Sequence, residues 1–298
     1  MLILKPEVHE TIWGGNKLTK ISGTDCYKIG HLYSVNCNKS ESNFILNGNY
    51  KGKTFNNFFD DNKEKYGLQI YEFFPLIIAL VDASENLSIQ VHPDDMVAPV
   101  LNPEIKYGKN ESWFFIDAPE SGYIYNGCKC NDMEELKKAI SEKRMGDFTD
   151  RLKVEKGDYT YIKAGTLHAL SKGSLVYEIE ENAGTTYRFY DFERVDINGK
   201  KRELQIPEAF FSIKLNNKSV TQKYGCGSID EKKYKTEYFK KLCSYKNMSS
   251  TLQVVTLLSG KCELEHIAVI PGMSIILFPE EEVQLNESEV MIAQPNPF

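Results

Sequence analysis

The sequence predicts a mostly β protein, and three features of the chain support this. Short runs rich in β-branched and aromatic residues recur along its length. Glycine, asparagine, aspartate and proline separate these runs at short intervals, as turns separate the strands of a sandwich or barrel. Only residues 131–152 place apolar side chains at helical spacing among charged ones. The pattern therefore predicts a sandwich or barrel of short strands with one helical insertion.

The predicted elements fall into two groups. The first group of predicted strands comprises residues 73–81, 87–91, 112–116, 123–125, 159–162, 175–180 and 185–190. The second group comprises residues 252–258, 261–270 and 274–278. The helical insertion can begin at Asn131 or Asp132 as N-cap, because acidic residues follow in its first turn. The polar, basic stretch 216–250 has few core candidates and predicts a connection between two units.

Composition excludes several classes of protein. The 298 residues include 42 acidic and 36 basic side chains, a net charge of −6, which argues against a nucleic-acid or anionic-membrane partner. No apolar run approaches the ~18 residues of a membrane span, and charges come too early in the chain for a signal peptide. The seven cysteines are odd in number and scattered. We therefore expect reduced thiols and a cytoplasmic location.

Two predicted strands carry polar side chains on a single face. Ser88, Gln90 and His92 are each two residues apart, so they form one column on a strand. Lys109 and Glu111 are also two residues apart, so they lie on one face of a second strand-like segment. Imidazole nitrogen, carboxylate oxygen and amide oxygen are a mixed ligand set suited to a borderline divalent metal such as zinc.

A third segment adds His168, which follows a corner at Gly165. Each histidine taken alone also fits an ordinary role: His92 as a polar turn residue beside Pro93, and His168 as a half-buried residue with a hydrogen-bond partner. The sequence of the third segment favours the metal. Gly157-x5-Lys163-Ala164-Gly165-x2-His168 resembles the second conserved motif of the cupins. Gln90-Val91-His92 with Glu111 resembles the first, with a long insertion between His and Glu.

Four segments taken together resemble one particular family of cupins. Residues 74–95, 108–118, 157–170 and 175–194 resemble type I mannose-6-phosphate isomerase, in order and with compatible spacing. The resemblance implies a cupin jelly-roll with the helical insertion near residues 131–152, followed by a smaller, metal-free cupin-like jelly-roll. We expect the boundaries of these two domains at residues 1–232 and 233–298.

The resemblance also implies roles for individual residues. It implies one zinc ion per chain, held by Gln90, His92, Glu111 and His168. It implies catalytic roles for Arg188, Lys109 and Glu178, and substrate contacts from Ser88, Lys109 and Arg188. Glu178 is the better carbon base on its chemistry, and a zinc-bound water is the alternative. Arg188 stays charged at working pH, so it stabilises negative charge or binds phosphate. Ordinary ion pairing is the competing role for all three charged residues.

The implied function is interconversion of mannose 6-phosphate and fructose 6-phosphate through an enediol. Such chemistry needs an electrophile for the developing oxyanion and a base of suitable pKa. One departure bears on substrate: Ala79 stands where relatives commonly have lysine, so an isomerase of another aldose or aldose phosphate is the alternative. A second alternative is a sugar-binding metal cupin without turnover. Lys109, Glu178 and Arg188 weigh against it, since binding alone needs no such groups.

Overall fold

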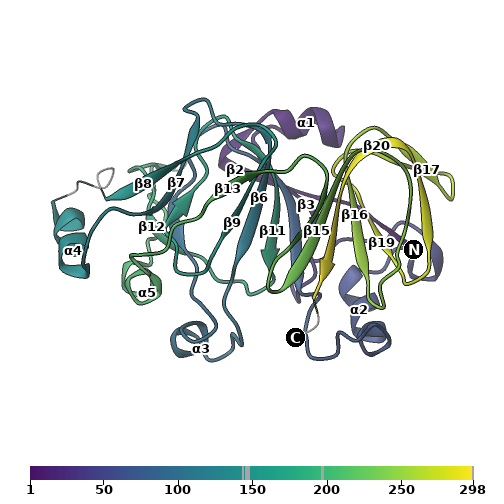
Figure 1. The fold of residues 1–298 in the computed structure, drawn as a ribbon, viewed down its shortest axis with the longest axis horizontal. Helices are drawn as coiled ribbons and strands as arrows, with labels where there is room; N and C mark the ends of the chain where they lie inside the picture. The colour runs from purple at the N-terminus through teal and green to yellow at the C-terminus, as the bar shows by residue number, and fades with distance from the viewer. Residues whose placement is uncertain (143, 145–147, 196–197, 297–298) are drawn as a thin grey trace. The chain divides into compact units, whose positions relative to one another are not determined.

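The computed structural model describes the chain apart from residues 143, 145–147, 196–197 and 297–298 (Figure 1). Its residues form two compact units. Unit 1 comprises residues 1–10, 16–80 and 224–298, and unit 2 comprises residues 11–15 and 81–223. Strands β2 (Glu7–Gly15) and β4 (Leu76–Asp82) run from one unit into the other. The expected domain boundary between residues 232 and 233 stays a prediction.

Unit 2 is built on two groups of antiparallel strands. One contains β13, β9, β6 and β11 in that order, and the other contains β12, β5, β10, β7 and β8. The strands are β5 (Ile89–Val91), β6 (Glu111–Asp117), β7 (Tyr123–Cys128), β8 (Thr149–Lys153), β9 (Asp158–Ile162), β10 (His168–Ala169), β11 (Leu175–Glu181), β12 (Tyr187–Tyr190) and β13 (Thr221–Lys223). The helices are α3 (Ala98–Leu101), α4 (Met133–Ser141) and α5 (Ile206–Ser212).

Alternation along β5 separates core from site. Ile89 and Val91 are fully buried in an apolar cluster that also contains Ala169 and Phe189. Gln90 lies between them, so its side chain points to the opposite face of the sheet. The apolar residues therefore hold the strand in register, and that register decides which polar side chains meet.

Helix α4 begins as the sequence predicts, because Asp132 is its N-cap and accepts a hydrogen bond from the Glu135 N–H at 2.8 Å. The helix occupies part of the segment for which helical structure was predicted. The end of that segment is strand β8, which pairs with β7 (Figure 1). Residues 143 and 145–147 of the predicted insertion lie outside the described part of the chain.

Unit 1 contains a sheet in the order β1, β19, β16, β20, β15 and β14. The strands of unit 1, inside and outside this sheet, are β1 (Leu2–Leu4), β3 (Ile29–Val35), β14 (Gly227–Asp230), β15 (Tyr234–Lys246), β16 (Gln253–Ser259), β17 (Cys262–Leu264), β18 (Ile267–Val269), β19 (Ser274–Leu277) and β20 (Glu282–Pro295). Its helices are α1 (Lys17–Ser22) and α2 (Phe55–Asn62), with 3-10 turns η1 (Gly48–Tyr50) and η2 (Lys63–Tyr66). The core of this sheet includes Ile3, Val255 and Ile275.

Two further details of the fold differ from the sequence predictions. The stretch 216–250 is not a bare connection, because it supplies β13, β14 and the long β15, which pairs with β20 (Figure 1). The alternating buried residues Tyr234, Thr236 and Tyr238 explain this strand among the charged residues. The predicted strand 261–270 is a hairpin of β17 and β18, reversed at Glu265 and His266, which both have positive φ.

The prediction of a mostly β fold with few helices is confirmed. In the described part of the chain, no helix has both the length and the apolar character needed to cross a bilayer.

Candidate metal centre and active site

Four strands of unit 2 bring polar side chains into one row. The β-ladders pair Arg188 of β12 with Gln90 of β5, Gln90 with His168 of β10, and His168 with Asn126 of β7. Directly paired residues of antiparallel strands project from the same face of a sheet. The site therefore receives Arg188, Gln90 and His168 from neighbouring strands, although the sequence separates them by up to 98 positions.

Strands β6 and β11 supply the carboxylates. Their antiparallel ladder pairs Glu178 with Trp113 and Glu180 with Glu111, so all four side chains lie on one face. Donor atoms of Glu111, Glu178 and Glu180 lie within 4.8 Å of one another. One ligand atom each of His92, Glu111 and His168 also lie within 4.8 Å of one another. The site is therefore enclosed between the two groups of strands in unit 2.

Backbone carbonyls decide which nitrogen of each histidine faces the site. His92 Nδ1 donates to the carbonyl of Thr185 at 2.7 Å, and His168 Nδ1 donates to the carbonyl of Thr166 at 2.8 Å. A carbonyl can only accept, so each neutral ring keeps a lone pair on Nε2. This is the orientation that backbone acceptors give to metal-binding histidines.

Both Nε2 atoms then meet the Glu111 carboxylate. His92 Nε2 lies 3.0 Å from Glu111 Oε2, and His168 Nε2 lies 3.2 Å from Glu111 Oε1. All three side chains are at most 1% exposed. Burial and the positive charge of Lys109 lower the pKa of His92 to about 4 although Glu111 opposes this shift, so the ring is neutral. A lone pair facing a carboxylate is repulsive unless a proton or a cation lies between them.

The spacing of these atoms fits a cation. Donors ~2.1 Å from a tetrahedral zinc ion lie roughly 3.4 Å from one another, close to the distances between these side chains. Glu111 Oε1 is buried and has no hydrogen-bond partner of good geometry. Burial would raise the pKa of Glu111, but a proton held between its carboxylate and His168 or His92 lowers that pKa well below its ordinary value. Glu111 is therefore the anionic member of the set. The three residues fit a divalent metal by charge, spacing and ligand type.

Gln90 lies beside this set. Its Nε2 is 3.3 Å from His168 Nε2. A half-turn of the amide would place Oε1, the atom that can bind a cation, where Nε2 now lies. The structure thus brings together all four side chains that the resemblance implies as metal ligands, and their binding of an ion stays a prediction.

Lys109 is buried beside the carboxylates. Its Nζ lies 2.8 Å from Glu180 Oε2 and 3.6 Å from Glu111 Oε2. Burial alone would lower the pKa of Lys109, but Glu180, Glu111 and Glu178 together raise it. Lys109 is therefore an ammonium group that can donate hydrogen bonds to a negatively charged oxygen and does not act as a base.

Glu178 is a buried carboxyl group with one oxygen engaged. The Trp113 Nε1–H donates to Glu178 Oε1 at 2.7 Å, and Oε2 is buried without a hydrogen-bond partner. Burial and the charges of Glu180 and Glu111 raise the pKa of Glu178 well above its ordinary value, against the opposing effect of Lys109 and Trp113. A raised pKa brings a carboxylate closer to the proton affinity that a general base needs near neutral pH.

The remaining predicted residues lie on the same strands. Arg188 is partly buried on β12, and its backbone N–H donates to Gln205 Oε1 at 3.0 Å. Ser88 is buried immediately before β5, in the column of Gln90. The roles of both in binding substrate stay predictions.

Sequence reasoning missed two side chains of this site. Glu180 is two residues after Glu178, and Trp113 is two residues after Glu111, so strand alternation alone could have placed both on the site face. The carbonyls of Thr166 and Thr185 were also missed, but no sequence signal marks a backbone acceptor. Register and loop conformation decide those contacts.

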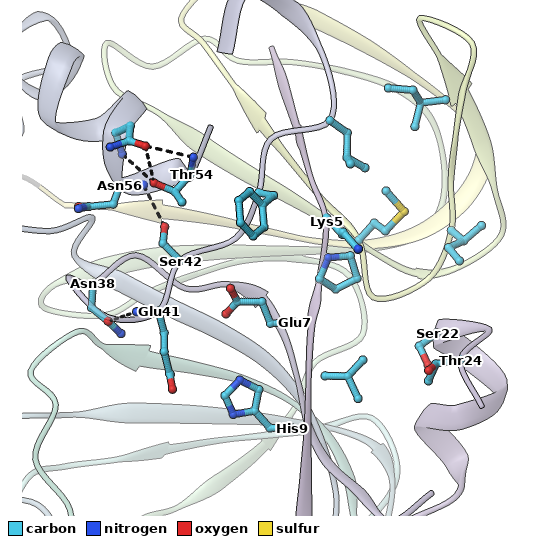
Figure 2. A pocket seen from close by; sticks show the side chains of 18 of the residues that line it. Lys5, Glu7, His9, Ser22, Thr24, Asn38, Glu41, Ser42, Thr54 and Asn56 are labelled. Atoms are coloured by element: carbon cyan, nitrogen blue, oxygen red, sulfur yellow. Dashed lines mark hydrogen bonds between the residues drawn. The ribbon is translucent and has the colours of Figure 1, made fainter. Parts of the chain in front are cut away.

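A cavity of about 1200 Å³ lies elsewhere, in unit 1. Figure 2 shows Glu7, His9 and Glu41 gathered on one side of it and Ser42 hydrogen-bonded to the segment at Asn56. None of the predicted metal or catalytic residues lines this cavity. The chemistry of the buried side chains, and not cavity size, therefore identifies the candidate active site.

Comparison with known proteins agrees with this site. The cupin fold, with histidines and carboxylates buried between its strands, defines the class of this protein. Residues 1–111 match the model of the phosphomannose isomerase type I catalytic domain. The structure superposes on that of mannose 6-phosphate isomerase from Bacillus subtilis with a TM-score of 0.79 and 25% identity, covering 98% of this chain and 99% of the other.

Two curated relatives are closer in sequence. A probable mannose-6-phosphate isomerase of Bacillus subtilis, GmuF, is 38% identical over 216 residues, which are 72% of this chain and 68% of the relative. A mannose-6-phosphate isomerase of Streptococcus mutans is 35% identical over 70% of this chain and 66% of its own. The chain belongs to the type I phosphomannose isomerase family. The prediction of an isomerase of this family is confirmed.

Proposed function

We propose that this protein interconverts mannose 6-phosphate and fructose 6-phosphate, using one divalent metal ion held by His92, Glu111, His168 and Gln90. Zinc is the ion that the ligand set favours. One observation carries the proposal. Two buried imidazoles, each oriented by a backbone carbonyl, turn Nε2 toward the same ionised carboxylate. When bound, the ion would supply Lewis-acid polarisation and positioning of sugar oxygens.

Glu178 is the group that moves the proton between C2 and C1 in this proposal. Its unpartnered Oε2 is the atom that can accept a proton from carbon, while Trp113 holds Oε1. The raised pKa of Glu178 lets it take the proton from one carbon and return it to the next. Because Glu178 is buried, the proton stays with the carboxyl group during the transfer and exchanges slowly with water.

Lys109 stabilises the negative charge that develops on oxygen in the enediol-like transition state. Its ammonium group is held by Glu180 and Glu111, so it is oriented before substrate arrives. Arg188 lies on the same sheet face as Gln90 and brings a second positive charge to the site, which can either bind the substrate's phosphate group or stabilise the transition state. The retention of Lys109, Glu178 and Arg188 around one site favours turnover over sugar binding alone.

The experiment is a turnover assay of the purified protein on a panel of aldose phosphates and free aldoses. It is run after chelation and again after zinc, cobalt or manganese is restored. We expect conversion of mannose 6-phosphate to fructose 6-phosphate that vanishes on chelation and returns with metal. Full activity in the chelated protein would contradict the metal. A preference for a different aldose phosphate would support the alternative that Ala79 raises.

A further inference from the structure

Arg188 carries a positive charge that nothing in the described part of the chain neutralises directly. Its guanidinium makes no ion pair and no side-chain hydrogen bond there, and its Nε is buried without a partner. A partly buried charge without a partner is costly, because it loses water and gains nothing in exchange. Such a group indicates a place where an anion binds.

A second guanidinium approaches Arg188 from the segment before α5. The Gln205 N–H donates to the Arg188 carbonyl at 2.9 Å, and Gln205 Oε1 accepts from the Arg188 N–H at 3.0 Å. These two bonds hold Gln205 against β12, and Asp191, the residue that follows β12, binds Arg202. Arg202 is near enough that, after burial, its charge is the largest cause lowering the pKa of Arg188, while Asp191 opposes it.

Asp191 fixes the position of Arg202. The buried carboxylate accepts from Arg202 Nε at 2.7 Å and from Arg202 Nη2 at 2.5 Å. Asp191 also pairs with Arg194, whose Nη1 donates to the carbonyl of Asn86. All donor nitrogens of Arg194 are therefore engaged, whereas Nη1 of Arg202 has no partner in the described residues. Arg194 is structural, and Arg202 keeps one edge of its fork available.

The charges of this cluster do not balance. Three guanidinium groups, of Arg188, Arg194 and Arg202, accompany the single carboxylate of Asp191. The surplus of two positive charges matches a phosphate monoester, which carries about −1.5 to −2 charges at pH 7. Guanidinium groups also bind phosphate oxygens in pairs through their planar forks.

The distance from the metal ligands suits a hexose phosphate. Arg188 on β12 is separated from His168 on β10 by β5 alone. Neighbouring strands are ~4.8 Å apart, so two spacings put the backbones of these residues roughly 10 Å apart. The phosphate of a hexose 6-phosphate lies at the opposite end of the carbon chain from the reacting C1 and C2. One end of such a substrate can thus reach the metal site while the other reaches the arginines.

We propose that Arg188 and Arg202 together form the subsite for the phosphate group of the substrate, with Asp191 as the residue that positions Arg202. The inference rests on the proposed function, which it deepens by assigning the residues that select a phosphorylated sugar. Because Arg188 pairs with Gln90 of β5 and also binds Gln205, a phosphate held here leaves the reacting carbons of the sugar free to reach Glu178 and the metal ligands.

The first test compares two sugars in two variants. Arg202→Gln removes the proposed contact and leaves Asp191 paired with Arg194. Lys201→Gln is the matched control, because it removes one positive charge from the neighbouring residue, whose side chain is 62% exposed. Loss of a charge-assisted contact corresponds to ~10- to 100-fold in affinity. We expect Arg202→Gln to raise KM for mannose 6-phosphate by ~10- to 100-fold with kcat within about threefold.

The two sugars separate a contact from a structural effect. For free mannose we expect kcat/KM of Arg202→Gln within about twofold of wild type, since this substrate has no phosphate to lose. We expect Lys201→Gln to stay within about twofold for both sugars, because an exposed charge is screened. Equal losses on both sugars in Arg202→Gln, equal effects in the control, or unchanged kinetics with mannose 6-phosphate would overturn the subsite.

The second test measures binding without turnover, so it separates the subsite from the proposed function. Inorganic phosphate is titrated into wild type, Arg202→Gln, Arg202→Lys and Lys201→Gln by calorimetry. We expect about tenfold weaker binding in Arg202→Gln, partial recovery in Arg202→Lys and no change in the control. This result without turnover of mannose 6-phosphate would refute only the proposed function. Turnover with unchanged phosphate affinity in Arg202→Gln would refute only the subsite. Melting temperatures confirm that each variant is folded, and Arg202→Lys carries the test if Arg202→Gln is not.

Discussion

Lys109 Nζ lies closer to Glu180 Oε2, at 2.8 Å, than to Glu111 Oε2, at 3.6 Å. Glu180 is also directly opposite Glu111 in the ladder between β11 and β6. The ammonium group therefore bridges two carboxylates, only one of which is a proposed metal ligand. When Glu111 gives its lone pairs to a cation, Glu180 remains as the anionic partner that keeps Lys109 in place.

This arrangement predicts that substitution of Lys109 lowers activity more than substitution of Glu180. Lys109→Met should keep the metal and lower kcat by ~10²–10³-fold, the usual loss when one preorganised donor to an oxyanion is removed. Glu180→Gln should stay within about tenfold of wild type, because the amide oxygen still accepts from Lys109. Steady-state kinetics with metal analysis checks both. A near-normal kcat in Lys109→Met would show that Lys109 forms a structural ion pair and does not stabilise the transition state.

The metal ligands predict a simple stoichiometry. Purified wild type should contain about one divalent ion per chain, and His168→Ala should lose it, because a buried ligand with an oriented lone pair is removed. His266→Ala is the matched control, since this histidine is 99% exposed in unit 1. Elemental analysis after gel filtration measures the ion. Full metal occupancy in His168→Ala would contradict the assignment of His168 as a metal ligand.

Glu178 predicts a specific pH dependence. As a base it works only when ionised, so activity should fall as pH drops through its raised pKa, earlier than for an ordinary carboxylate. The hydrogen bond from Trp113 lowers that pKa, so Trp113→Phe should move the acid limb of kcat/KM to higher pH. Glu178→Gln should lower kcat by ~10²–10⁴-fold without loss of metal. An acid limb unmoved in Trp113→Phe would count against Glu178 as the base.

Arg188→Lys tests the geometry of the guanidinium. The variant should keep its fold and metal but lose kcat/KM for mannose 6-phosphate by ~10- to 100-fold, because a point charge replaces a planar fork of donors. A loss confined to KM indicates phosphate binding, and a loss in kcat indicates stabilisation of the enediol-like transition state. Kinetics close to wild type would leave Arg188 with neither role.

Asp191 predicts how stability depends on pH. Burial would raise its pKa, but Arg202 and Arg194 lower it below the ordinary value. A carboxyl group with a lowered folded pKa stabilises the fold above its unfolded pKa of ~3.9, and this stabilisation disappears as pH falls through the folded value. Asp191→Asn should therefore be about 1–3 kcal/mol less stable at pH 7, with a smaller difference toward pH 3. Urea unfolding at both pH values measures this, and a difference that grows toward pH 3 would contradict it.

Strand alternation predicted much of the site from the sequence. Gln90 and His92, and Lys109 and Glu111, share faces because side chains two apart on a strand point the same way. The same rule would have added Glu180 and Trp113. It also could have located β15, where Tyr234, Thr236 and Tyr238 are buried in alternation. The resemblance to a family then supplied roles that alternation by itself cannot assign.

The sequence by itself determined the strand-rich fold, the faces of individual strands and the types of ligand available. Only the tertiary structure decided which faces meet, because the register of separate strands depends on long-range packing. It pairs Arg188 with Gln90 and Gln90 with His168, and it turns the carbonyls of Thr166 and Thr185 toward the two imidazoles. It also joins Asp191 to Arg202 across a loop. Such contacts follow from the packing of the whole unit, since no local pattern of residues encodes the distance between two strands.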